Sequence, residues 1–247
     1  MTVIDDLLAA VPTDNSRILD VRIGAAWTAV VAEVAGARRC GLAATLSRLG
    51  HDGPSVRDAG HLHELSSREL CELARSSSQA EVSVGMAAIN ALLPRDPSTW
   101  VDINASELLA ERGADKAVAL VGHFPFVDWL RARVKTLWVL EQEPQAGDLP
   151  ASAAAEVIPQ ADFVALTSMT LLNHTFDSLM ALRRPDAPVM LLGPSTPLAP
   201  LLFDRGVQLL SGAVVEEIDA VLHGVSQGAG FRQLHRLGVR LVTMART

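Results

Sequence analysis

The sequence predicts an α/β protein in which a mostly parallel sheet, with helices on both faces, follows a small α+β domain. Beyond about residue 105, short apolar runs alternate with segments of helical periodicity, and this alternation favours right-handed crossovers and parallel strands. In the first hundred residues strands come first and helices follow, which is the α+β order. We therefore expect two domains, over residues 1–100 and 105–247, joined by a linker at about residues 95–104.

The first domain is expected to combine a short helix, three strands and two further helices. β-Branched residues on both sides of Gly24 predict a hairpin, and a stretch rich in Gly, Asp, Pro and Ser predicts a loop. Ser66 and Glu69 have the spacing of a helix start, and Pro94 stops the last helix. The expected bounds are 4–11 for the first helix, 18–23, 28–34 and 40–46 for the strands, 51–60 for the loop, and residue 66 onward and 81–93 for the later helices.

The second domain is expected to repeat strand and helix in turn. Its apolar runs are short, rich in Val and Leu, and lack the polar alternation of a half-exposed strand, which is typical of a buried parallel sheet. The expected strands are 117–121, 136–140, 163–167, 189–192, 207–210 and 240–243, and the expected helices are 126–133, 151–157, 173–181, 199–204, 216–224 and 231–237.

Composition limits the function classes. Hydrophobic residues make up 49% and charged residues 20% of the 247-residue chain, which is enough for a full core and excludes a disordered chain. The net charge of −7, without a basic stripe, argues against a nucleic-acid surface, and no apolar run approaches the ~20 residues that cross a bilayer. Cys40 and Cys71 lack CxxC spacing, and the acidic N-terminus lacks signal-peptide features. We expect a cytoplasmic protein with buried thiols.

The segment VGHFPF, residues 121–126, is expected to form part of a binding site. Gly122 and His123 stand where a buried strand hands over to a helix, which is where open α/β sheets bind ligands. Gly122 permits a turn and a close backbone approach, whereas a histidine beside it is poorly explained by packing. The segment lacks two of the three glycines of a GxGxxG fingerprint, which argues against a dinucleotide site.

Three later strand ends also carry polar side chains. Glu141 follows Gly122 by nineteen residues, and its carboxylate could accept hydrogen bonds from a ligand or hold a cation. Hydroxyl and amide side chains crowd the segment from Thr167 to Thr175, where Thr170 or Asn173 is expected to cap the next helix and the remaining oxygens to face a polar ligand. The fourth strand ends in Gly193-Pro194-Ser195-Thr196-Pro197, a stiff polar turn without the GxSxG motif of a nucleophilic serine.

Together these motifs resemble the putative heavy-metal chelation family, long of unknown function. The resemblance covers most of residues 80–225 and rests on GMAAINALLP, VGHFPF, VLEQEP followed by GDLP, TSMTLLNHT and LLGPSTPLAPLLFDRGV. It implies an N-terminal domain similar to that of enolases, a Rossmann-like C-terminal domain and a site in the cleft between them. Carried onto this chain, the implied pocket residues are Gly122, His123, Phe124, Glu141, Thr167, Asn173, Gly193, Ser195 and Thr196.

Two functions compete on this basis, and a third hypothesis is a scaffold without a small-molecule site. The first is the binding or handling of a metal chelate or small anionic metabolite, with His123 and Glu141 as the residues that could reach a metal; the chain lacks the dense Cys and His set of a tight transition-metal site. The alternative is an enzyme that builds or modifies a small metabolite, with His123 as acid/base, Glu141 as its carboxylate partner, and a nucleotide or S-adenosylmethionine as cofactor. Under either hypothesis we expect no nucleic-acid or membrane partner, and a homodimer is compatible with both.

Overall fold

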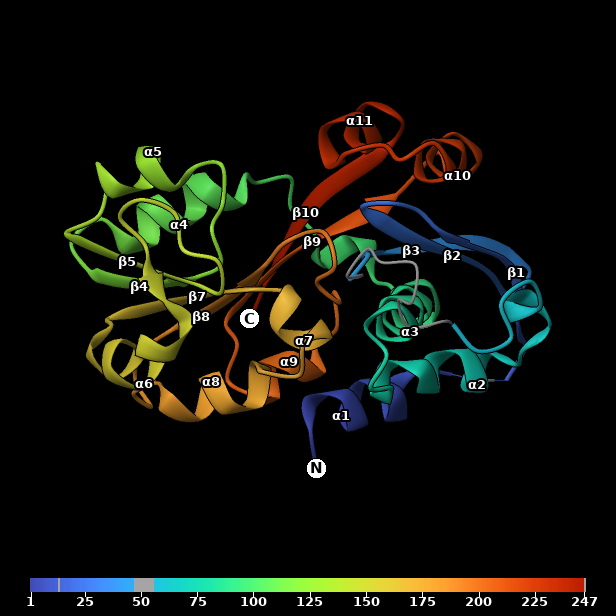
Figure 1. The fold of residues 1–247 in the computed structure, drawn as a ribbon, viewed down its shortest axis with the longest axis horizontal. Helices are drawn as coiled ribbons and strands as arrows, with labels where there is room; N and C mark the ends of the chain where they lie inside the picture. The colour runs from blue at the N-terminus through green and yellow to red at the C-terminus, as the bar shows by residue number, and fades with distance from the viewer. Residues whose placement is uncertain (13, 47–55, 247) are drawn as a thin grey trace. The chain divides into compact units, whose positions relative to one another are not determined.

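The computed structural model describes residues 1–12, 14–46 and 56–246, and the chain divides into two compact units (Figure 1). Unit 1 comprises Met1–Pro97, Pro194–Ala199 and Gly212–Leu241. Unit 2 comprises Ser98–Gly193, Pro200–Ser211 and Val242–Thr247. None of the helices in the described part of the chain is both long and apolar enough to cross a bilayer.

Unit 1 contains a three-stranded antiparallel sheet in the order β1-β2-β3. Its strands are β1 (Ser16–Ile23), β2 (Trp27–Val34) and β3 (Ala37–Ala44), so the predicted hairpin and third strand are confirmed. The β2–β3 turn places Ala35 and Gly36 at positive φ, which is the backbone of the tight turn that suits twisted strands. The expected loop over residues 51–60 falls partly outside the described residues.

Helices from both ends of the chain cover this sheet. α3 packs on β3 so closely that a Cβ on Gly41 would lie 2.1 Å from the Ala87 carbonyl oxygen. The other face carries Ala29, Val31, Cys40 and Leu42, which form one buried cluster with side chains of α10 and α11. The helices of unit 1 are α1 (Val3–Ala10), α2 (Ser67–Glu72), α3 (Gln79–Leu92), α10 (Ile218–Ser226) and α11 (Phe231–Arg236), with 3-10 turns at Leu62–Glu64 and Leu73–Arg75.

The seven-stranded sheet has the order β10-β9-β8-β7-β4-β5-β6. Its strands are β4 (Ala117–Val121), β5 (Thr136–Glu141), β6 (Leu149–Pro150), β7 (Phe163–Thr167), β8 (Val189–Leu192), β9 (Leu209–Val215) and β10 (Val239–Ala245). The pairs from β6 to β9 along this order are parallel. β10 runs antiparallel to β9, because Glu216 N donates to Gly238 O and Arg246 N to Gln208 O. The mostly parallel α/β class is therefore confirmed.

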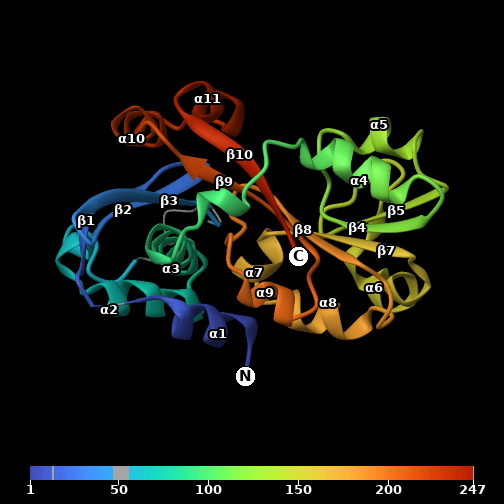
Figure 2. The same ribbon diagram turned by 180° about the vertical axis from the view of Figure 1, so that it is seen from behind.

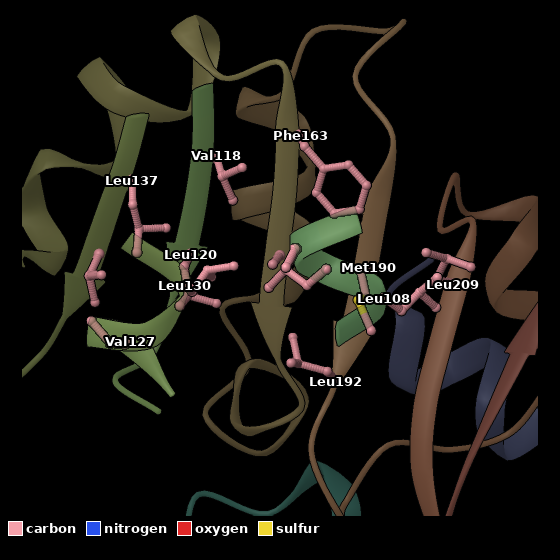
Figure 3. Close-up of a cluster of buried hydrophobic side chains, with 14 residues drawn as sticks. Leu108, Val118, Leu120, Val127, Leu130, Leu137, Phe163, Met190, Leu192 and Leu209 are labelled. Carbon is pink, nitrogen blue, oxygen red and sulfur yellow. The ribbon is translucent and has the colours of Figure 1, made fainter. Parts of the chain in front are cut away.

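In unit 2, α4 (Ala105–Gly113) and α5 (Val127–Arg131) cover one face of the sheet, and α6 (Ala154–Val157) and α8 (Phe176–Leu182) cover the other (Figures 1 and 2). The remaining helices are α7 (Met169–Leu172) and α9 (Leu201–Asp204), with 3-10 turns at Pro97–Thr99, Ala151–Ala153 and Ile158–Gln160. Alternate strand residues such as Val118, Leu120 and Phe163 form one core with Leu108 of α4 and Leu130 of α5 (Figure 3). This core therefore determines which face of β4 and β7 packs against α4 and α5.

Three sequence expectations differ most from the structure. The sequence reading had no helix at α4, whose only large apolar residues are Leu108 and Leu109. The helix expected over residues 173–181 begins only at Phe176, as α8, and a separate short helix, α7, comes before it; a turn where His174 has a φ of 59° separates the two. The strand expected at residues 207–210 begins at Leu209 and continues to Val215, because it passes through Ser211 and Gly212 without turning.

Candidate functional site

The candidate site lies where the strand order of the large sheet reverses. From β4, the chain adds β5 and then β6 on one side and afterwards adds β7, β8 and β9 on the other. The reversal therefore falls between β4 and β7, and the crevice at the carboxyl ends of such a pair is the usual ligand position in an open α/β sheet. Val121 is in register with both Leu140 and Leu166, so the ends of β4, β5 and β7 are level.

Gly122 and Glu141 shape the turn at the end of β4. Gly122 has a φ of 101°, and a Cβ placed there would lie 3.0 Å from Cβ of Thr167. The Glu141 carboxylate accepts hydrogen bonds from the backbone N–H of His123 at 2.8 Å and of Gln142 at 2.6 Å. A ligand or a cation was the expected partner of Glu141. In the structure, its carboxylate forms hydrogen bonds that connect the turn after β4 with the turn after β5.

His123 is held by a carboxylate that the sequence reading did not identify. Its Nδ1 lies 2.8 Å from Oδ2 of Asp148, whose side chain is 0% exposed, whereas the His123 side chain is 25% exposed. The same Asp148 oxygen accepts from Gln145 N at 3.0 Å, and Oδ1 is buried with no partner among the described residues. An imidazole whose Nδ1–H donates a hydrogen bond to a carboxylate can present the lone pair of Nε2 to a metal or a substrate.

The Phe124 side chain packs against the hydrophobic core of unit 2. Its ring stacks on Phe126 with centroids 5.1 Å apart, and both rings pack against the core cluster of unit 2. It lies beside the turn, because the Gly122 Cβ position is 3.4 Å from a ring carbon of Phe124. The ring therefore supports the turn that carries His123.

The polar side chains at the end of β7 and after it mostly form hydrogen bonds within their own segment. Asn173 Oδ1 accepts from the N–H and the hydroxyl of Thr175 at 3.2 and 2.7 Å, and Thr167 Oγ1 accepts from Met169 N at 3.4 Å. The prediction that Thr170 or Asn173 caps the next helix is wrong. The N-cap residue is Ser168 in α7 and Thr175 in α8, and neither side chain accepts a hydrogen bond from its helix. The reason is the turn at residues 173–175, which ends one helix before the other begins.

The polar turn after β8 is divided between the units. Gly193 belongs to unit 2 and has a φ of 123°, whereas Ser195 and Thr196 belong to unit 1. Ser195 is 1% exposed. Its hydroxyl accepts from Ala44 N, at the end of β3, at 2.8 Å, and its carbonyl accepts from Asn90 Nδ2 of α3 at 3.1 Å. Thr196 is 2% exposed and its Oγ1 has no partner in the described residues.

Of the residues expected in one pocket, unit 2 thus contains Gly122, His123, Phe124, Glu141, Thr167, Asn173 and Gly193, and unit 1 contains Ser195 and Thr196. Within residues 1–12, 14–46 and 56–246, no three side chains of His, Cys, Asp and Glu converge as a set that could hold a metal ion. Asp148 is the residue that sequence reasoning missed at the site. Its signal was the GDLP motif, an acidic residue next to a glycine in the loop after β5.

Relatives of this chain include proteins of known structure but unknown function. An uncharacterised protein of Methanocaldococcus jannaschii is 26% identical over 216 residues, which cover 85% of this chain and 83% of that protein. A crystal structure from Desulfitobacterium hafniense is similar with a TM-score of 0.82 at 24% identity and covers 99% of this chain and 98% of its own. One from Pyrococcus horikoshii has a TM-score of 0.83 at 19% identity, with 98% of each chain covered. These two structures show a shared fold.

Two family models match the chain, and both are described as "Putative heavy-metal chelation". One matches residues 4–93 and the other residues 104–244. The second match alone spans more than half of the 247 residues. The chain therefore belongs to the putative heavy-metal chelation family.

Proposed function

We propose that this protein binds a small anionic metabolite or a metal chelate at the carboxyl ends of β4 and β7, with Nε2 of His123 as the group that reaches the ligand. The observation that carries the proposal is the 2.8 Å contact between His123 Nδ1 and the fully buried Asp148 carboxylate. This contact lies beside the strand-order reversal, where the fold itself favours a ligand.

The contact has the form that proteins use to prepare a histidine for a metal. Metal-binding histidines almost always donate their second ring N–H to a carboxylate, carbonyl or water, which fixes the tautomer and the ring orientation. The Gln145 N–H in turn donates a hydrogen bond to the same Asp148 oxygen, which restrains the carboxylate beside the ring. An imidazole restrained in this way offers its Nε2 lone pair in one direction.

The donor set favours a metal that arrives already chelated. His123 supplies one nitrogen, and the nearby Glu141 carboxylate is engaged by backbone N–H groups. A closed transition-metal site takes about four protein ligands. A metal held by an organic chelator needs only one further donor, and it carries the anionic oxygens that a polar strand-end site can receive.

The test is ligand binding by the purified protein with three probes: Co²⁺, citrate, and the Co²⁺–citrate complex. Isothermal calorimetry should show binding of the complex, and native mass spectrometry with elemental analysis should show any metal or organic mass that co-purifies. His123→Gln should abolish binding of the complex. Asp148→Asn should weaken it by about tenfold to hundredfold, because the ring loses its orientation.

His223→Gln is the matched control, because His223 is exposed on α10 and lies in unit 1. It should bind the probes as the wild type does. Full binding by His123→Gln would remove this histidine from the site and with it the proposal.

The geometry also supports an enzyme as a second candidate. A buried aspartate on Nδ1 and an open Nε2 are the arrangement of a general base, in which the carboxylate stabilises the imidazolium that forms. His123 would then be the acid/base and Asp148, rather than Glu141, its orienting residue. Mass spectrometry separates the two candidates: a binding protein returns its ligand unchanged, whereas an enzyme returns a changed mass, and His123→Gln should stop the change.

A further inference from the structure

Five hydroxyl or amide side chains lie between Thr167 and Thr175, and four of them have partners within this segment. Thr170 Oγ1 donates to Thr167 O at 2.7 Å, Thr167 Oγ1 accepts from Met169 N, and Asn173 and Thr175 bind each other. The fifth is Ser168, whose hydroxyl has no partner within the described residues and makes no cap bond to α7. Among the hydroxyl and amide side chains of this segment, Ser168 is therefore the one left to contact something else.

The Ser168 hydroxyl is enclosed but still accessible. The residue is 2% exposed. Among the described residues, the fully buried side-chain oxygens without a partner belong to Ser78, Asn90, Asp148 and Thr196, so the unpaired Ser168 Oγ keeps some accessible surface. A nearly buried hydroxyl without a partner is unfavourable by about 1–3 kcal/mol, unless a ligand or water satisfies it.

The fold places Ser168 directly after β7, the strand that pairs with β4, and its backbone N–H donates to Leu192 O of β8 at 2.8 Å. Val121 pairs with Leu166, so His123 and Ser168 each follow a paired position by two residues on adjacent strands. Gly193 completes the arrangement from the β8 side, because a Cβ there would lie 2.6 Å from Ser168 Oγ. A side chain at position 193 would thus occupy the space that the hydroxyl needs.

We propose that Ser168 is a second ligand-contacting residue, which donates its hydroxyl proton to an anionic oxygen of the ligand that His123 binds. This inference rests on the proposed function and names the ligand chemistry: a carboxylate-bearing compound, free or complexed with a metal. His123 Nε2 contacts the metal or the charged end, and Ser168 recognises a neighbouring carboxylate oxygen.

The test compares Ser168→Ala with Ser178→Ala by calorimetry, using Co²⁺, citrate and the Co²⁺–citrate complex. Ser178 is an exposed serine on α8 that donates to Thr175 O, and it serves as the matched control. Ser168→Ala should weaken binding of citrate and of the complex by about tenfold, the effect of one lost hydrogen bond to a charged group, and leave Co²⁺ binding unchanged. Ser178→Ala should bind all three probes as the wild type does.

The ligand-free protein supplies an independent readout. Removal of an unpartnered hydroxyl should leave Tm unchanged or raise it in Ser168→Ala, whereas Thr170→Val, which loses the bond to Thr167 O, should lower Tm by about 2–4 °C. A similar fall in both variants would assign Ser168 a structural role and overturn the inference. Unchanged citrate and complex binding by Ser168→Ala would overturn it too, with the proposed function intact. If the wild type binds none of the probes, both proposals fail.

Discussion

At the ends of β4 and β8, two glycines make room for side chains of the strand between them. The Cβ position of Gly122 is filled by Thr167 and that of Gly193 by the Ser168 hydroxyl. Both glycines also have a φ that other residues rarely adopt, 101° and 123°. Their role is therefore steric and conformational at once, and it fixes how the end of β7 presents its polar groups.

Gly122→Ala should lower the free energy of unfolding by about 1–3 kcal/mol, because strain at positive φ adds to the contact with Thr167. Urea denaturation measures this change. Gly147→Ala is the control: its φ of 89° is similar, but the nearest atom to its Cβ position, Arg131 Nη2, is 3.7 Å away. Equal losses in the two variants would show that contact with Thr167 contributes nothing.

The residues of the site were predictable only in part. Gly122, His123 and Glu141 follow buried strands, and parallel strands bring their carboxyl ends to one edge, so their proximity followed from periodicity. The contact of His123 with Asp148 spans 25 residues and depends on the path of the loop after β5, for which no periodicity exists. Ser195 was grouped with Gly193 because the two are close in sequence, but its hydrogen bonds are to β3 and α3.

At the scale of elements, α3 and β3 meet backbone to backbone. A Cβ on Gly41 would lie 2.1 Å from Ala87 O and 2.3 Å from Ala91 N. A Cβ on Gly85 of α3 would likewise lie 2.0 Å from the backbone N of Ala74. This helix therefore packs without side chains at two of its contacts, which explains why twelve of its fourteen residues are buried.

Gly41→Ala should destabilise the protein by about 3 kcal/mol or more, because the added methyl meets backbone atoms that cannot rotate away. Chemical denaturation should show the loss, and circular dichroism should show whether the native fold persists. Ala37→Ser changes an exposed position of the same strand and should alter stability by less than about 0.5 kcal/mol. A Gly41→Ala protein as stable as the wild type would contradict the close packing of α3 on β3.

The elements predicted best were those buried on both faces. β4, β7 and β8 have the bounds that the sequence predicts, because their apolar runs stop abruptly at glycine or polar residues. α4 was missed altogether because its apolar stripe is narrow. Asn104 followed by Glu107 is nevertheless a helix-start signal, and Asn104 Oδ1 does accept from Ser106 N at 2.9 Å. β9 was misplaced because Ser211-Gly212 interrupts its apolar run, and the predicted strand ended before them.

Both cysteines lie in unit 1 and report on its integrity. Cys40 is 1% and Cys71 2% exposed, and both are free thiols. Burial raises the pKa of each thiol from 9.0 to about 12. The folded protein therefore keeps these protons at a pH where the unfolded chain has lost them.

Stability should consequently decrease as the pH rises from about 9 towards 12, because the unfolded chain, with its lower thiol pKa, binds fewer protons in this range. Denaturation at several alkaline pH values measures the slope. The Cys40→Ala, Cys71→Ala double variant should show a shallower slope, and an unchanged slope would exclude the thiols as its cause. In the native protein at neutral pH, neither thiol should react with Ellman's reagent until denaturant is added.

The sheet of unit 1 is built from the first fifty residues, yet α10 and α11, which cover one of its faces, come after residue 217. During synthesis on the ribosome, β1, β2 and β3 emerge long before these helices exist. While the intervening chain is translated, the apolar face of this sheet lacks its partners from α10 and α11; this face consists of Ala29, Val31, Cys40 and Leu42. The nascent chain thus carries an uncovered sheet face until translation is almost finished, and chaperones have their longest opportunity to bind there.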